Sequence, residues 1–171
     1  MIIDRLVRLN NTLGTAAIWV SCLLLIYVVV HITIEIIARS FFDLSTHSVD
    51  EFVGYAIGAM TFLSLAFTFR NQKHVRVTIL QSFVRGKFAV LVEVLCIVMT
   101  FAMTVFLARY VFRTLARDWE RGTVSPTLTE TPIWIIDSLI LLGLVLFMSQ
   151  LLSSLVLTIR DGVPKKISHS G

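Results

Sequence analysis

The chain has 171 residues, of which 56% are hydrophobic and only 15% are charged, and its mean hydropathy is +0.85. Soluble domains carry about 25% charged residues, and a small globule cannot bury so many apolar side chains. The composition therefore excludes an ordinary water-soluble domain and indicates an integral membrane protein. The excess of Lys and Arg over Asp and Glu would suggest nucleic acid in a soluble protein, but here the cations lie between apolar runs. They are better explained as an orientation signal, with no nucleic-acid partner.

Four apolar runs are long enough, or nearly so, to cross a bilayer core about 30 Å thick as helices. They cover about residues 13–38, 52–69, 88–108 and 133–159. No strand-like alternation persists along them, and lipid tolerates only helices or closed barrels. The sequence thus predicts an all-α membrane protein with four transmembrane helices in a single domain over residues 1–171. The first run exceeds the roughly 7–15 apolar residues of a signal-peptide core, so we expect a retained anchor.

Lys and Arg are divided unevenly among the segments that flank the runs. The N-terminal segment, the loop of residues 70–87 and the C-terminal tail together hold ten, against five on the other side. The positive-inside rule predicts that both termini and the 70–87 loop are cytoplasmic. We expect the cations of this elbow between the second and third helices to face lipid headgroups: Lys73, Arg76, Arg85 and Lys87. Its apolar part, residues 77–84, either lies flat as a short amphipathic piece or continues into the third span.

Four arginines on the other side of the membrane follow a regular spacing. They recur every fourth residue and therefore share one helical face: Arg109, Arg113, Arg117 and Arg121. The third helix is accordingly predicted to continue past the membrane toward Trp119. The stripe either meets solvent and lipid phosphates or forms a docking face for a partner.

Ionisable side chains inside apolar runs are candidate functional residues, because burying them in lipid is costly. Glu35 lies four residues after His31 and four before Arg39, so these side chains share a face and a local Glu35–Arg39 pair is expected. Glu93 and Asp137 also lie near the ends of their runs. No carboxylate lies at the midplane, where a proton relay is commonly found.

Small and hydrogen-bonding residues in the second and fourth runs predict helix packing. Gly54 and Gly58 lie one turn apart, which lets another helix backbone approach closely. Gln150 and Ser153 lie nearer the middle of the fourth run, where such groups usually hydrogen-bond to neighbouring helices.

Motifs for chemistry are missing from the sequence. It has no phosphate-cradling glycine loop, no nucleophile elbow and no Cys/His metal cluster. We therefore expect no enzymatic activity, and no catalytic, cofactor-binding or metal-binding residue.

Two blocks of sequence carry a family resemblance. In the first, Asp50-Glu51 is followed by FVGYAIGAMTFLSLAFTFRNQKHVRVTIL. The second reads WERGTVSPTL from Trp119, with Pro132-Ile-Trp134 opening the fourth run. In this order and spacing, the blocks resemble the small membrane subunit of tripartite ATP-independent periplasmic (TRAP) transporters, the DctQ-like family, over residues 39–157.

The resemblance implies a scaffold in the bacterial inner membrane. Its expected partners are a large multi-span subunit that carries the substrate and sodium sites, a periplasmic binding protein that delivers an organic acid, and membrane lipids. Residues 40–50 and 114–131 would offer a docking surface. The motif positions would be structural or interface residues: Glu51, Arg70, His74, Trp119, Gly122, Ser125, Pro126 and Trp134.

Two other functions remain open from the residues alone. An autonomous four-helix proton-coupled exporter would rely on Glu35 as its membrane carboxylate. A haem-binding electron carrier would rely on His31, for which the sequence offers no second histidine at similar depth.

Overall fold

The computed structural model of the chain describes residues 2–42, 49–83, 87–126 and 129–161. Its elements are α1 (Ile2–Phe42), α2 (Val49–Phe83), α3 (Lys87–Arg121) and α4 (Trp134–Asp161). All four contain a segment long and apolar enough to cross a membrane, and the described residues form no β-strand beyond one isolated bridge. The predicted all-α fold with four transmembrane helices is therefore confirmed.

Each helix is longer than the apolar run that predicted it. α1 has 41 residues, against the predicted span of 13–38, and α3 continues to Arg121, as the spacing of its arginines predicted. At 1.5 Å per residue α1 is about 60 Å long, roughly twice the thickness of the hydrocarbon core. Hydropathy marks where side chains change from apolar to polar, whereas the backbone hydrogen bonds of a helix continue beyond that point.

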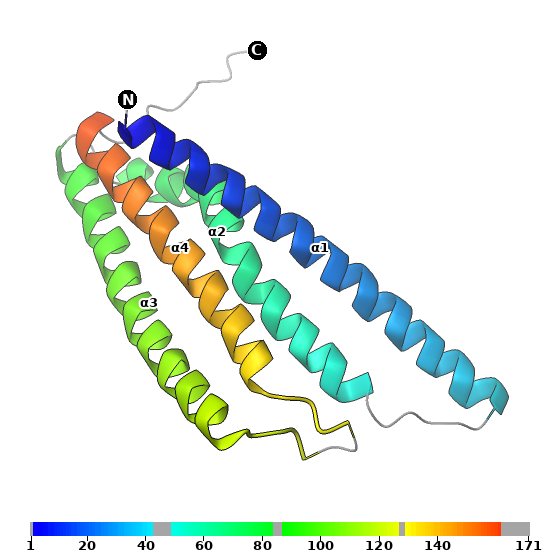
Figure 1. Cartoon of the computed structure of the whole chain (residues 1–171). Helices are drawn as coiled ribbons and strands as arrows, with labels where there is room; N and C mark the ends of the chain where they lie inside the picture. Colours follow the sequence, from blue (N-terminus) through cyan, green and yellow to red (C-terminus); the bar gives the residue numbers. More distant parts are fainter. Residues whose placement is uncertain (1, 43–48, 84–86, 127–128, 162–171) are drawn as a thin grey trace, which may run out of the picture.

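The helices form one layer rather than a closed bundle. Figure 1 shows the order α3, α4, α2, α1 across the layer, with the helices fanning apart away from the two termini. The main contacts follow this order, and α1 and α3 do not touch within the described residues. We call the end with the two termini the terminus end, and the opposite end, where α3 turns into α4, the hairpin end.

The centre of the layer is the seam between α2 and α4. α2 presents a buried stripe at helical spacing: Ala56, Ala59, Leu63 and Ala66. Gly143 of α4 lies against it, since a Cβ built on Gly143 would be 2.5 Å from the carbonyl carbon of Phe62. The rings of Phe69 of α2 and Phe147 of α4 also meet edge to face, and Leu144 and Leu151 of α4 are 1% and 0% exposed. Small residues thus allow the two backbones to approach closely.

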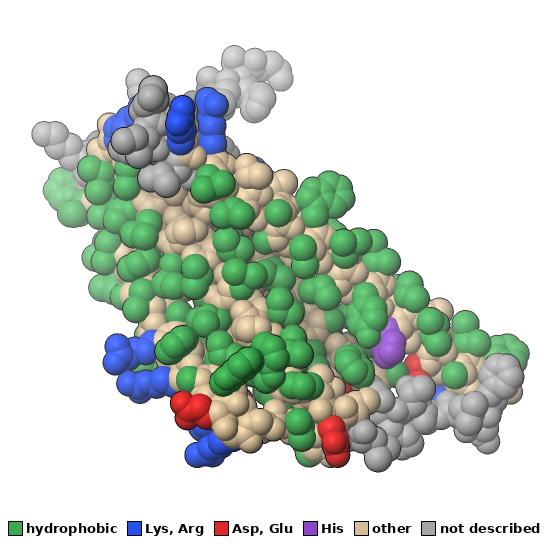
Figure 2. Space-filling view, viewed as in Figure 1, with side chains coloured by type: hydrophobic (Ala, Val, Ile, Leu, Met, Phe, Trp, Pro, Cys, Tyr) green, Lys and Arg blue, Asp and Glu red, His purple; other side chains and the backbone are tan. Residues whose placement is uncertain are grey.

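Most apolar side chains point outward. Only 11–28% of the residues in the most apolar window of each helix are buried. Figure 2 shows a broad apolar belt between arginine side chains at the terminus end and charged side chains near the end of α3. Lipid or other membrane helices must cover this belt, because exposed apolar surface of this extent is not stable in water.

The elbow between the second and third helices is largely helical. The apolar segment of α2 ends at Arg70, while the helix continues to Phe83. In Figure 1 this last part turns away from the axis of the span and runs behind α4 toward the start of α3. Residues 84–86 lie outside the described part of the chain.

Candidate functional site

Polar side chains gather at the two ends of the helix layer. The hairpin clasp joins the α3–α4 hairpin to α2 through Glu51, Tyr55, Ser125 and Thr129. The terminus clasp joins α1 to α4 and α2 through Asn10, Asn11, Arg70, Ser149, Gln150 and Ser153. Each clasp connects helices far apart in sequence, so each is a candidate site for structural function.

The hairpin begins where α3 ends. Gly122 has a φ of 59° and its N–H donates to the carbonyl of Trp119 at 3.3 Å. This left-handed conformation favours glycine and closes the helix. Beyond it the Ser125 N–H donates to the Thr131 carbonyl at 2.9 Å, and Val124 pairs with Pro132 in a short antiparallel bridge. The WERGTVSP block therefore combines the end of α3 with a turn of defined shape.

The hairpin is hydrogen-bonded to the first turns of α2. The Thr129 hydroxyl donates to Oε2 of Glu51 at 3.0 Å. The Tyr55 hydroxyl is hydrogen-bonded to both Glu51 and Ser125, and Ser125 is only 5% exposed. The two sequence blocks that carry the family resemblance thus meet in space at this clasp.

The two tryptophans of the second block also meet. The rings of Trp119 and Trp134 pack edge to face with centroids 4.7 Å apart, a favourable aromatic geometry. Trp119 is nevertheless 63% exposed. Asp118, which is 8% exposed, lies close to Asp137 of α4, and Nε of Arg117 is 3.8 Å from Oδ1 of Asp118. The ends of α3 and α4 are therefore joined by aromatic and polar contacts.

The terminus clasp centres on two adjacent asparagines of α1. The amide of Asn10 donates to Oγ of Ser153 at 3.0 Å and accepts from the Ser149 hydroxyl at 2.7 Å. Gln150 donates to Oδ1 of Asn11 at 3.3 Å.

Arg70 adds the end of the second span to this clasp. Its Nη1 donates to the Asn11 carbonyl at 3.1 Å, and its guanidinium lies 5.4 Å from the centre of the Phe67 ring. The structure thus brings together Arg70, Gln150 and Ser153, which the sequence analysis selected for different reasons. Asn10 lies before the first predicted span and was missed, although its amide donates and accepts as buried polar groups require.

The predicted glycine pair has a different environment. A Cβ built on Gly54 or on Gly58 would meet no atom within 4 Å. The close approach of two helices lies instead at Gly143, which was not selected because no second glycine stands one turn away. The alanine spacing of α2 was the sequence signal available for that seam.

The remaining predicted residues are Pro126 and the basic residues of the elbow. Pro126 is an exposed residue of the hairpin. The side chains of the predicted elbow residues Lys73, His74, Arg76, Arg85 and Lys87 lie outside the described part of the structure.

The two polar side chains considered for other functions are both packed within the chain. The Glu35–Arg39 pair is confirmed, with Nε of Arg39 at 3.1 Å from Oε1 of Glu35. His31 stacks on Tyr27 at 5.3 Å between ring centroids and meets the edge of Phe52.

Within the described residues, no group of three or more His, Cys, Asp or Glu side chains could hold a metal ion. The arrangement can join helices and present a turn, and both clasps consist of hydrogen bonds suited to that purpose.

Comparison with known proteins bears on the same two blocks. The family model for the DctQ component of tripartite ATP-independent periplasmic transporters matches residues 28–161. No curated protein and no solved structure matches the chain. The family match covers both blocks, both ends of the hairpin and most of the four spans, which is well over half of the sequence. The chain is therefore a multi-pass membrane protein that belongs to the DctQ family, the small component of TRAP transporters.

Proposed function

We propose that the chain is the non-catalytic small permease subunit of a sodium-coupled TRAP transporter for organic acids, located in the bacterial inner membrane. It scaffolds the large membrane subunit and helps dock the periplasmic binding protein. The observation that carries this proposal is the single helix layer, whose apolar side chains mostly face outward. A layer offers two broad faces to other membrane helices, whereas a closed bundle offers only its rim.

The distribution of polar groups is consistent with a scaffold role. The clasp residues bond to other helices of the same chain, and several hydroxyls at intermediate depth bond to backbone carbonyls. Ser21 donates to the carbonyls of Ala17 and Met60, and Thr104 donates to that of Thr100. The Ser21 hydroxyl thus joins α1 to α2, the Thr104 hydroxyl bonds within α3, and solute selectivity is then a property of the large subunit.

The hairpin end supplies the proposed docking surface for the binding protein. Trp119 and Val124 are 63% and 44% exposed there, and exposed aromatic side chains are typical interface anchors. The exposed arginines near the end of α3 add positive charge beside them: Arg113, Arg117 and Arg121. Residues 40–50, the other proposed docking loop, lie largely outside the described part of the chain.

The proposed orientation places both termini in the cytoplasm. It follows from the excess of Lys and Arg in the terminal segments and the elbow. All four lysines belong to this side: Lys73, Lys87, Lys165 and Lys166. A membrane-impermeant amine reagent added to spheroplasts should therefore leave the chain unlabelled, and should label it in inverted vesicles. Labelling of Lys73 or Lys165 from the periplasmic side would contradict this orientation.

Reconstitution tests the scaffold role. The chain is purified in gentle detergent with the products of neighbouring reading frames, and its partners are identified by mass spectrometry. Liposomes then receive either this chain alone or the assembled membrane subunits with the binding protein. We expect sodium-dependent uptake of an organic acid only in the second case. Uptake by the chain alone, or proton-coupled efflux lost in Glu35→Gln, would overturn the proposal.

A further inference from the structure

The hairpin projects beyond the apolar segments of the chain. The candidate span of α3 ends at Arg121 and that of α4 begins at Trp134, so residues 122–133 lie outside both. Lipid tails and membrane helices contact the apolar belt, whereas the hairpin lies where hydrocarbon has given way to water. A water-soluble protein is therefore the class of partner that this end of the layer can meet.

Exposed cations gather on the α3 side of the hairpin end, which we call the basic side. Figure 2 shows arginine side chains over the end of α3. They recur at helical spacing, with one exposed carboxylate among them: Arg113, Arg117, Arg121 and Glu120. Three cations beside one carboxylate leave the basic side with a net positive charge.

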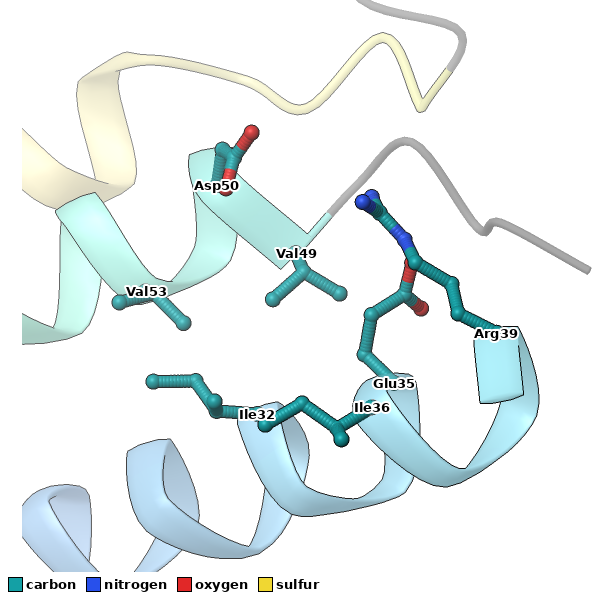
Figure 3. Close-up of a pocket in the computed structure, with 7 residues that line it drawn as sticks. All are labelled: Ile32, Glu35, Ile36, Arg39, Val49, Asp50 and Val53. Carbon is teal, nitrogen blue, oxygen red and sulfur yellow. The ribbon is translucent and has the colours of Figure 1, made fainter. Parts of the chain in front are cut away.

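The other side of the hairpin end, which we call the acidic side, consists of residues 122–133 and the first turn of α2. The hairpin segment contains no Lys or Arg, and its Glu130 is exposed. Asp50 of α2 is also exposed, and Figure 3 shows its carboxylate pointing away from α1. The nearby cation of α1, Arg39, is bonded to Glu35. The acidic side therefore has a net negative charge.

The backbone holds Glu130 in a defined place. Its φ is 44°, a left-handed conformation that is uncommon in residues other than glycine. Both of its neighbours are bonded: the Thr129 hydroxyl donates to Glu51 at 3.0 Å, and the Thr131 carbonyl accepts from the Ser125 N–H at 2.9 Å. The turn thus presents an exposed carboxylate from a backbone that is fixed on each side of it.

The charges of the two sides do not neutralise each other. Within the part of the chain that the structure describes, neither Arg121 nor Glu130 takes part in an ion pair. Val124 stands between them in the sequence, is 44% exposed and pairs with Pro132 across the hairpin. The hairpin end therefore combines separated charges of opposite sign with exposed apolar surface.

We propose that this division of charge fixes the orientation in which the periplasmic binding protein docks. The docking face of that protein carries carboxylates that meet the basic side, Lys or Arg that meet Glu130, and apolar residues that cover Val124. The reversed orientation brings like charges together, which is unfavourable, so complementary charges select one of the two. This inference rests on the proposed function and adds which part of the partner faces which element.

Exchanging the two charges tests orientation separately from net charge. The chain and the large membrane subunit are placed in phosphatidylcholine nanodiscs, and surface plasmon resonance measures the affinity for the purified binding protein. Arg121→Glu and Glu130→Lys should each weaken binding about three- to tenfold at low salt, because an attraction becomes a repulsion of similar size. The double variant has the net charge of the wild type. We expect it to bind more weakly than either single variant, because both sides are then reversed.

Controls separate this effect from folding and from general electrostatics. Arg8→Glu makes the same charge change at an exposed position of the terminus end and should leave binding unchanged. Arg121→Lys keeps the charge and should bind nearly as the wild type does. Circular dichroism and thermal unfolding establish that each variant is folded. At about 0.5 M salt the differences between the variants should shrink, because exposed charges are then screened.

The possible outcomes distinguish the orientation from the docking role. Wild-type affinity in the double variant would mean that only net charge matters, and would overturn the inference. Unchanged binding in Arg121→Glu would assign the arginines to lipid phosphates and would overturn it as well. In both cases the binding protein still docks, so the proposed function survives. If the wild-type complex does not bind the binding protein at all, the docking role fails and this inference fails with it.

Discussion

Glycines mark two different environments around α2: Gly143 lies on α4 where that helix packs against α2, and Gly54 and Gly58 lie on an open face of α2 itself. On the seam with α4, a Cβ on Gly143 would lie 2.5 Å from the carbonyl carbon of Phe62 and 2.9 Å from the backbone nitrogen of Leu63. On the face that carries Gly54 and Gly58, a Cβ would meet no atom within 4 Å. The same residue type closes one helix contact within the chain and leaves another face open. Glycine spacing therefore marks where a helix can approach, but it does not tell whether that helix belongs to the same chain.

Enlarging Gly143 should have the largest effect on the chain itself. The neighbouring atoms are backbone atoms of α2, which cannot rotate aside, so α2 and α4 must separate. We expect Gly143→Ala to destabilise the protein by about 1–3 kcal/mol, and Gly143→Leu to prevent isolation of a folded monodisperse protein. Thermal unfolding in detergent measures the difference. Gly58→Ala is the matched control, and its unfolding temperature should not fall below that of the wild type by more than the variation among repeated measurements. An unchanged unfolding temperature in Gly143→Ala would show that the backbone of α2 does not restrict this position.

The open face should respond in the opposite way. The double variant Gly54→Leu with Gly58→Leu should change the free energy of unfolding of the isolated chain by no more than about 0.5 kcal/mol, as expected for changes away from packed features. In the proposed complex it should abolish co-purification with the large membrane subunit, because two leucines keep a partner helix away. A loss of stability in the isolated chain would mean that the face is packed internally. Unchanged co-purification would assign the face to lipid.

Sequence patterns predicted the four helices, the extension of α3 and the Glu35–Arg39 pair because each depends on neighbours within a few residues. The Gly143 contact does not, since its partner is the α2 backbone at Phe62 and Leu63, about eighty residues away in sequence. A backbone surface has no residue signature of its own. The alanine stripe of α2 indicates a packed face, yet only the structure shows that Gly143 of α4 packs beside it, on Phe62 and Leu63.

In the two clasps as well, the sequence identified some of the residues and missed their partners. Glu51 and Ser125 were selected from the family resemblance, but their common partner Tyr55 was not, because a tyrosine in an apolar run usually signals packing alone. Asn10 and Asn11 fell before the first predicted span, which was drawn from hydropathy. Their importance arises from the length of α1, whose polar first turns reach Ser153 and Gln150 of α4.

The contrast between closed and open contacts extends to α1, which meets α4 chiefly through this terminus clasp. Asn10→Ala should lower the free energy of unfolding by about 0.6–1.7 kcal/mol, the range of hydrogen bonds between membrane helices. Ser153→Ala should cost less, and the double variant should cost less than the sum, because both remove the 3.0 Å bond. Denaturant unfolding of the wild type, the two single variants and the double variant in mixed micelles gives the free energies for this double-mutant cycle. Strict additivity would mean that the two side chains do not interact.

The hairpin also combines a contact within the chain with an exposed surface: Thr129 bonds to Glu51, whereas Trp119 nearby is 63% exposed. Thr129→Val removes the 3.0 Å hydrogen bond at an exposed position, so its cost should not exceed about 0.5–1 kcal/mol. A change of this size is too small to measure reliably by global unfolding, but it should increase the rate at which the turn opens locally. Amide exchange at Ser125, whose N–H donates to the Thr131 carbonyl, should become about two- to fivefold faster. Thr131→Val keeps that carbonyl and should leave the rate unchanged. Equal rates in both variants would mean that the backbone bridge alone holds the hairpin, and that the Glu51 contact serves another purpose, such as presenting the turn to a partner.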